Sequence, residues 1–115
     1  MTTSQHLDLT LINGYLEALD LDVIEQMLNL YIQQSAVYLT AINSALAAKE
    51  QKSWQEQCHK MKGAAASAGL SQVHQQLTEI EKSTEEWAQK AQQISVLTAL
   101  NQQAITTFQH WLAEQ

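Results

Sequence analysis

The chain contains no proline and only three glycines among its 115 residues. Proline removes a backbone hydrogen bond and clashes inside a helix, and glycine is the next least favourable residue there. Their scarcity therefore permits long uninterrupted helices. Alanine, leucine, glutamine and glutamate, which favour helix, are abundant, and no alternating run of β-branched residues indicates a strand. The sequence predicts an all-α protein.

The first half of the chain contains two predicted helix starts. Asp8 and Asp20 are both in the position of an N-cap, and each is flanked by apolar residues spaced as a hydrophobic staple. A short helix is expected from Asp8 to about Leu19, and a long one over roughly 21–48. The apolar seam of the long helix comprises Ile24, Leu28, Tyr31, Tyr38, Ile42 and Ala45, widened by Met27, Leu30, Leu39 and Leu46.

Three further helices are predicted in the second half. The third covers roughly 52–68, and Gly69 follows it as the left-handed residue that ends a helix at low cost. Ser71 is the predicted N-cap of the fourth helix, whose seam extends to Trp87. The last helix is expected over roughly 94–113. Short connections between four substantial helices predict an up-and-down four-helix bundle with a short additional N-terminal helix.

Length and charge narrow the class of protein. A chain of this length suits one domain, predicted over residues 1–115. The formal net charge of −6 argues against binding nucleic acid. The chain lacks the basic start of a signal peptide and any apolar run near the roughly 20 residues that span a membrane. We expect a cytoplasmic protein without direct membrane contact.

One histidine is predicted to face water beside a glycine. On a helical wheel of the third helix, the predicted core residues lie within about 40° of one direction, as Trp54, Cys58, Met61, Ala65 and Ala68. His59 lies about 140° from that direction, and Lys62 and Gly63 follow one turn later. A glycine inside a helix costs roughly 0.8–1 kcal/mol relative to alanine. No core packing requires Gly63 on the solvent side, so the simplest reason for it is the close approach of a large partner to His59.

The chemistry that fits this arrangement is phosphoryl transfer. A neutral imidazole is a competent nucleophile, and the charges of Lys60 and Lys62 attract a phosphoryl group and offset its negative oxygens. The chain has no glycine-rich phosphate loop, no carboxylate cluster for magnesium and no nucleotide-pocket signature. The residues therefore indicate a phosphate carrier without a metal site, whose catalytic machinery lies on a partner.

The motif His59-x-x-Lys62-Gly63, followed by small residues and then Gly69-Leu70, resembles the histidine-containing phosphotransfer (HPt) domain. It is most similar to the C-terminal HPt domains of ArcB-like hybrid sensor kinases, and the helix pattern fits over essentially the whole chain. This resemblance implies that His59 is the phosphoacceptor through its Nε2 nitrogen. It implies that Lys62 binds the phosphoryl group or the carboxylates of the partner, and that Gly63 lets the partner approach.

The resemblance also implies the partners. Receiver domains would bind transiently, donating and accepting the phosphoryl group through their aspartates and supplying Mg²⁺, so that the carrier needs no cofactor and has no kinase activity of its own. Docking is expected at Gln55, Lys60, Gly63 and Ala66. Glu81, 22 positions after His59, is the candidate side chain to support the histidine. The domain is expected to be a monomer, either free-standing or as the cytoplasmic C-terminal domain of a membrane sensor kinase.

Two other classes of protein stay open. The dimerisation core of a histidine kinase also presents a histidine on a helix bundle, but it typically carries an acidic residue next and a proline soon after. Here Lys60 follows His59 and proline is absent. A helical interaction module without phosphochemistry explains the amphipathic helices, but it does not explain Gly63 beside an exposed histidine.

The remaining chemically versatile side chains have simpler interpretations. Cys58, the only cysteine, lies in the core stripe and is expected to serve packing. His6, His74 and His110 form no i,i+4 pair with one another or with His59, so a zinc site is not expected. The three tryptophans are expected to anchor the core.

Overall fold

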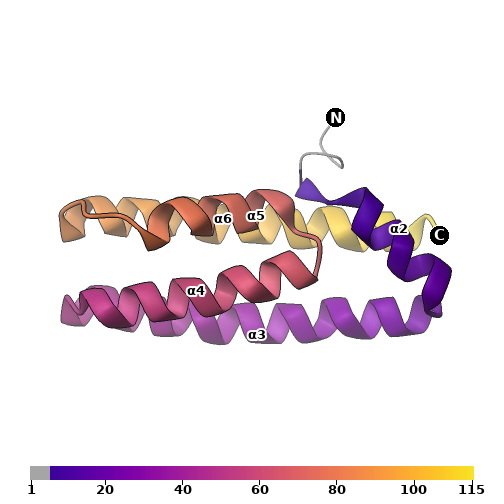
Figure 1. Cartoon of the computed structure of the whole chain (residues 1–115), viewed down its shortest axis with the longest axis horizontal. Coiled ribbons are helices and arrows are strands. Elements are labelled where there is room, and N and C mark those ends of the chain that lie inside the picture. The colour runs from indigo at the N-terminus through magenta and orange to yellow at the C-terminus, as the bar shows by residue number, and fades with distance from the viewer. Residues whose placement is uncertain (1–5) are drawn as a thin grey trace.

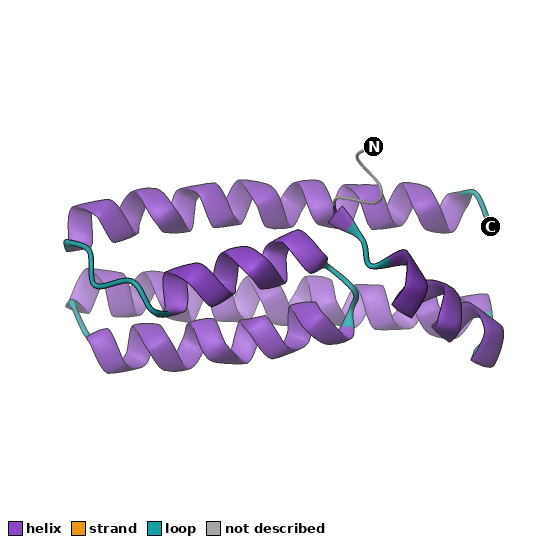
Figure 2. Ribbon diagram, turned by 45° about the horizontal axis from the view of Figure 1, so that its top comes forward, coloured by secondary structure: helices purple, strands orange, loops and turns teal. Residues whose placement is uncertain are grey.

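The computed structural model of the chain describes residues 6–115, shown in Figures 1 and 2. Its helices are α2 (Leu9–Ala18), α3 (Leu21–Ala48), α4 (Gln51–Ser67), α5 (Ser71–Glu81) and α6 (Trp87–Ala113). The last four run alternately up and down, and α3 packs against α4 and α6 while α5 packs against the same two helices. The short α2 lies across one end of the bundle. The predicted all-α four-helix bundle with an extra N-terminal helix is confirmed.

The α4 helix faces the core with the side that its sequence pattern predicts. Its predicted core residues are all buried, as Trp54, Cys58, Met61, Ala65 and Ala68. Trp54 also donates a hydrogen bond from its indole Nε1 to the backbone oxygen of Ile80 at 2.9 Å. Since a buried indole N–H needs an acceptor, this bond both satisfies Trp54 and holds α4 against the end of α5.

The end of α4 is held by glycine in the way that its sequence predicts. Gly69 has a positive φ of 76°. The amide of Leu70 donates to the oxygen of Ala65, and the amide of Gly69 donates to the oxygen of Ala66, as in a Schellman motif. The oxygen of Gly69 then accepts the amide of Asp8 at 2.7 Å. The turn after α4 therefore also fixes the start of α2.

Two predicted helix boundaries are wrong or incomplete. Ser71 is the first residue of α5 rather than its N-cap, which is Leu70, because the motif around Gly69 already directs Leu70 into the next helix. Asp20 occupies the N-cap position of α3, but its side chain makes no capping hydrogen bond. Asp8 does cap α2, accepting the amide of Leu11 at 3.1 Å.

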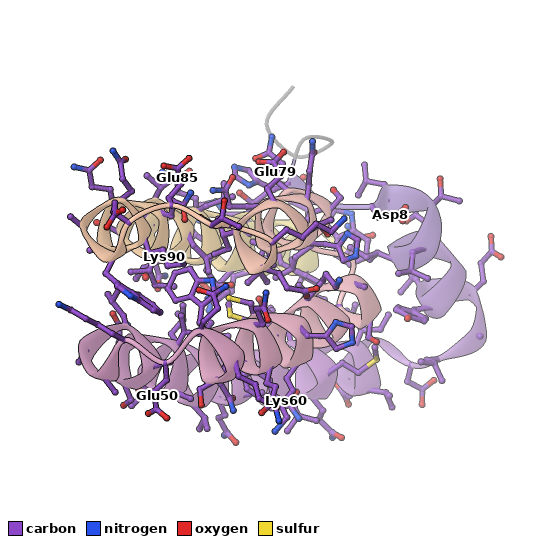
Figure 3. All side chains as sticks on the ribbon, turned by 60° about the vertical axis from the view of Figure 1, so that its left-hand side comes forward. Asp8, Glu50, Lys60, Glu79, Glu85 and Lys90 are labelled. Carbon is purple, nitrogen blue, oxygen red and sulfur yellow. The ribbon has the colours of Figure 1, made fainter. Side chains whose placement is uncertain are left out.

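The predicted start of the last helix is about two turns too late. Trp87 was predicted to extend the seam of the fourth helix, but it is the first residue of α6. Its ring packs edge-on against Trp54, with ring centroids 6.2 Å apart. The ammonium group of Lys90 lies 4.6 Å from the centre of the Trp87 ring and donates to the oxygen of Glu85 at 2.7 Å. These contacts stabilise the first turn of α6, and Figure 3 shows Lys90 there.

A buried polar network joins α3 to α6. The hydroxyl of Tyr31 donates to Asn101 Oδ1 at 2.6 Å, and Asn101 Nδ2 donates to the hydroxyl of Ser35 at 3.2 Å. Ser35 in turn donates to the oxygen of Ile32. Burial raises the pKa of Tyr31 far above its ordinary value, so the phenol stays a donor. Because each member has a partner, the network sets the register of the two helices without leaving a stranded polar group.

Within residues 6–115, no helix combines the length and the apolar character that crossing a bilayer requires.

Candidate functional site

The side chain of His59 lies on the outer side of α4 and is 71% exposed. The preceding residue, Cys58, is fully buried. Burial, with a smaller effect from the negative charge of Glu81, raises the pKa of the Cys58 thiol to about 12. The thiol therefore stays protonated at neutral pH, as a packing residue would. Of these two adjacent residues, Cys58 therefore packs in the core and His59 presents its ring to solvent.

A single carboxylate oxygen joins the two basic side chains of the site. Glu81 Oε1 lies 3.2 Å from His59 Nδ1 and 3.1 Å from Lys62 Nζ. Glu81 is the last residue of α5, so the packing of α5 on α4 brings it to the histidine. The side chains of Lys62 and Glu81 are only 20% and 18% exposed. Their partial burial makes this ion pair less screened by water than a pair on the open surface.

The contact with Glu81 determines which ring nitrogen keeps a free lone pair. An ionised carboxylate can only accept a hydrogen bond, so the bond requires His59 Nδ1 to carry the proton. In the neutral ring, Nε2 then holds the free lone pair. A carboxylate in this position also stabilises the positive charge that develops on the ring during attack. The geometry therefore prepares Nε2 to accept an electrophile such as a phosphoryl group.

The ionisation of Glu81 is coupled to its two partners. Partial burial acts to raise the pKa of Glu81, but the hydrogen bond and charge of Lys62, together with those of His59, hold this pKa below its ordinary value of 4.5. A carboxylate with a lowered pKa in the folded state stabilises the fold only when it is ionised. This contribution is present above pH 4.5 and is lost as the pH falls through the lower value of the folded state.

Replacing Glu81 with glutamine is expected to lower the free energy of unfolding by about 1 kcal/mol at neutral pH, because the ion pair with Lys62 is lost. Urea unfolding of both proteins between neutral and acid pH measures the difference. The difference should shrink as the pH falls below 4.5, where the wild-type carboxylate becomes protonated. Glu79→Gln, an exposed position of the same helix, should show no such trend. A difference between Glu81→Gln and wild type that is independent of pH would contradict the assigned coupling.

The surface around His59 is a shallow groove of about 480 Å³, lined by Gln55, Glu56, His59, Lys60, Glu81 and Lys82. Two of the predicted docking residues, Gln55 and Lys60, thus border the histidine directly. Lys60 is exposed and points away from the bundle (Figure 3). Ala66, another predicted docking residue, is exposed about two turns beyond His59 on α4.

Gly63 faces open space. A Cβ atom added there would meet no other atom within 4 Å. The absence of a side chain therefore serves no packing within the described residues 6–115, as the helical wheel indicates. The glycine leaves the surface next to His59 clear.

A second groove, of about 350 Å³, borders Gly63 on the side of α3. Its α3 residues are Met27, Leu30, Tyr31, Gln34 and Tyr38. Leu30 was predicted to widen the buried stripe of α3, but it is 53% exposed. Its direction differs by about 120° from that of the buried residues at 100° per residue. The sequence pattern did not predict that α3 contributes to this surface. The angle between Leu30 and the main seam on the helical wheel could have indicated it.

Within residues 6–115, no three side chains of histidine, cysteine, aspartate or glutamate converge on one point that could hold a metal ion.

The comparisons with known proteins identify the class of domain that this fold and site define. The family model of the Hpt domain matches residues 26–110, most of the chain, so the protein belongs to the Hpt domain family. Its role is phosphotransfer in two-component signalling. No curated protein matches the sequence.

Solved structures show the same fold over nearly the whole chain. The histidine-containing phosphotransfer domain of ArcB from Escherichia coli matches with a TM-score of 0.88 and 24% sequence identity, covering 99% of this chain and 98% of that one. A solution structure of the phosphotransfer domain of the anaerobic sensor kinase ArcB, also from Escherichia coli, matches with a TM-score of 0.84 and 24% identity, covering 97% and 91%. The predicted resemblance to ArcB-like HPt domains is confirmed.

Proposed function

We propose that the protein is a phosphorelay intermediate. His59 accepts a phosphoryl group from the aspartyl phosphate of one receiver domain and passes it to the aspartate of another. The observation that carries this proposal is the exposed ring of His59, whose Nδ1 lies 3.2 Å from the Glu81 carboxylate. A nucleophile that is both open to a partner and held in one tautomer suits transfer between proteins.

In the proposed reaction, the lone pair of His59 Nε2 attacks phosphorus while the bond from phosphorus to the aspartyl oxygen breaks. The departing aspartate keeps the electron pair, and the ring becomes a phosphorylated imidazolium whose Nδ1 proton faces Glu81. The transition state is loose, with negative charge spread over the phosphoryl oxygens. Lys62, held at the site by Glu81 at 3.1 Å, offsets part of that charge. The receiver supplies Mg²⁺ and the remaining catalytic groups, and the reverse reaction phosphorylates the second receiver.

The surface of this protein on which a receiver docks surrounds His59 on both sides of α4. Gln55, Lys60 and Ala66 are exposed, and Gly63 leaves space for the partner to come close. The exposed Leu30 adds apolar surface from α3. Such a small surface suits a contact below about 1,200 Å² in total, which is typical of transient encounters. Transient contact lets one carrier serve two receivers in turn.

The same proposal also excludes an activity, because a phosphate carrier does not phosphorylate itself from ATP. It carries a phosphoryl group but has no kinase activity of its own, and it works in the cytoplasm, either free-standing or as the C-terminal domain of a membrane sensor kinase. These points distinguish it from the dimerisation core of a histidine kinase, which takes phosphate from ATP.

Three phosphodonors test the proposal. A receiver domain carrying labelled aspartyl phosphate should transfer its label to the protein, as an acid-labile and base-stable phosphohistidine. Labelled ATP alone should leave the protein unlabelled, and labelling by ATP would favour the kinase core instead. Phosphorus NMR after incubation with a small phosphodonor should show a histidine phosphorylated at Nε2. No phosphohistidine with any of the three phosphodonors would leave only the plain interaction module.

A further inference from the structure

The charges of the chain are distributed unevenly along it. It has six basic and twelve acidic residues, yet none of these lies between 26 and 48 or between 91 and 113. The first run forms most of α3 and the second most of α6. The two helices lie side by side, on the opposite edge of the bundle from the contact between α4 and α5 where His59 and Glu81 meet. The protein therefore has one face without fixed charge.

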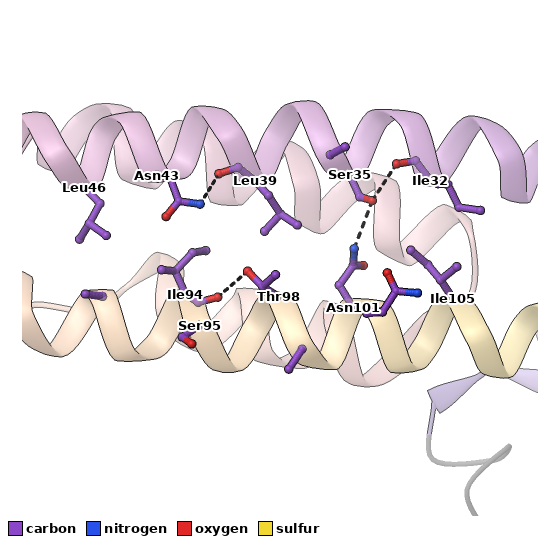
Figure 4. Close-up of a pocket in the computed structure, with 14 residues that line it drawn as sticks. Ile32, Ser35, Leu39, Asn43, Leu46, Ile94, Ser95, Thr98, Asn101 and Ile105 are labelled. Carbon is purple, nitrogen blue, oxygen red and sulfur yellow. Dashed lines mark hydrogen bonds between the residues drawn. The ribbon is translucent and has the colours of Figure 1, made fainter.

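A groove of about 770 Å³ runs along this face between α3 and α6 (Figure 4). Its α3 side repeats at steps of three and four residues, as Ile32, Ala36, Leu39, Asn43 and Leu46. Its α6 side repeats at the same steps, as Ala91, Ser95, Thr98, Gln102 and Ile105. This spacing is the seam of a helix that packs against another helix through knobs and holes. Within the two neighbouring seams, the larger apolar side chains pack against the core and form the floor of the groove, as Ile32, Leu39, Leu46 and Ile105. The exposed side chains open outwards, as Ala36, Asn43, Ala91, Ser95, Thr98 and Gln102.

The polar side chains in the groove are partly satisfied by their own helices. Asn43 Nδ2 donates to the oxygen of Leu39 at 2.9 Å, and Thr98 Oγ1 donates to the oxygen of Ile94 at 2.8 Å. Figure 4 shows both bonds. Covering the groove would therefore bury these donors without removing their partners. Removing water from these two donors therefore costs little.

We propose that this face, defined by the seams of α3 and α6, binds a second copy of the chain in a two-fold symmetric dimer. In a two-fold interface each residue near the axis meets its own twin, so any charge there would repel itself. Two copies that each carry a net charge of −6 repel in most orientations. Contact through the face without charge keeps the like charges of the two copies far apart, so it weakens that repulsion. Depletion of charge is also the compositional mark of an interface core.

The area of the face is sufficient for a modest dimer. Each charge-free run is about 35 Å long, and two adjacent helices are about 20 Å wide, which gives about 700 Å² per copy. A standard interface buries about 800 Å² per partner. The small side chains Ala36, Ala91 and Ser95 let the helices of the two copies approach closely. We expect association at micromolar concentration and above.

The proposed dimer revises the expectation of a monomer. That expectation depended on keeping the histidine free, and the α3–α6 face leaves it free. In the dimer, both copies of His59 point away from the interface, on opposite sides of the assembly. A receiver that covers His59 does not compete with the second copy.

Sedimentation equilibrium of the protein over a concentration range from about 10 µM to about 1 mM tests the proposal. The weight-average mass should rise from 12.9 kDa towards twice that value. Gln102→Glu, which places a carboxylate of the same shape in the groove, should raise the dissociation constant at least about tenfold. Gln103→Glu makes the identical change on the next residue, which does not line the groove, and should leave the constant unchanged.

Each outcome decides the proposal. A mass that stays at 12.9 kDa throughout would overturn it and leave the face to a different partner. A rise in mass that Gln102→Glu and Gln103→Glu alter equally would place the contact elsewhere on the molecule. Circular dichroism of both variants separates a weakened dimer from a weakened fold. Phosphotransfer to His59 should be the same in both variants, so this test stands apart from that of the phosphorelay.

Discussion

Replacing His59 with glutamine is expected to abolish the transfer of label from a phosphorylated receiver. Glutamine has no nucleophilic nitrogen, since its amide lone pair is delocalised, and so no covalent phosphoryl intermediate forms. The fold should persist, because the His59 side chain is 71% exposed and contributes no core packing. The free energy of unfolding should therefore change by less than about 0.5 kcal/mol beyond the loss of the contact with Glu81. Transfer of label and urea unfolding measure the two quantities.

His110→Gln is the matched control for this result. His110 is also exposed, but it lies on α6 near the C-terminus. Its replacement should leave transfer at the wild-type rate. If the His59→Gln protein took up as much label as wild type, the phosphoacceptor would be another residue, and loss of label in His110→Gln would identify it.

Replacing Gly63 with glutamine is expected to slow transfer about 10- to 100-fold while making the fold slightly more stable. The added side chain would occupy the space one turn beyond His59, where no atom now lies within 4 Å of the missing Cβ. A displacement of about 1 Å between reacting groups costs up to about 100-fold in rate. Removing a glycine from the middle of a helix stabilises it by up to about 1 kcal/mol. Transfer rates and unfolding free energies should therefore change in opposite directions.

Gly14 provides the control for the backbone effect. It lies inside α2, and a Cβ atom there would also meet nothing within 4 Å. Gly14→Gln should give a similar gain in stability with no change in transfer rate. Equal transfer by the Gly63→Gln and wild-type proteins would show that the partner does not approach over this glycine.

The sequence pattern was sufficient to predict features that depend on a single helix. The directions of Trp54 and His59 depend only on the 100° step between residues, so the wheel of α4 predicts which side is buried. The end of α4 follows from the freedom of Gly69 at positive φ, which is likewise a local property. The domain boundaries and the roles of the site residues stay predictions.

Contacts between helices could not be predicted from the sequence pattern. Trp87 fits the seam of α5 and that of α6 equally well by spacing, and it belongs to α6 because α5 already ends at Glu81. The pairing of Lys62 with Glu81 depends on how α5 packs on α4, so the sequence suggested Glu81 as a support for His59 but not the ion pair. The buried Asn101 was missed because a seam counts only apolar residues.

The hydrogen bond from Trp54 to Ile80 gives the protein a built-in optical reporter. Trp54 lies on the buried side of α4, five residues before His59, and its indole donates to the backbone oxygen of the residue immediately before Glu81. A phosphoryl group on His59 would draw Lys62 from Glu81 and disturb the end of α5. Indole emission responds to its hydrogen bond and to nearby charge, so intrinsic fluorescence offers a continuous signal of phosphorylation and docking. We expect this signal to follow phosphorylation of His59 in real time without an attached dye or radioactive label.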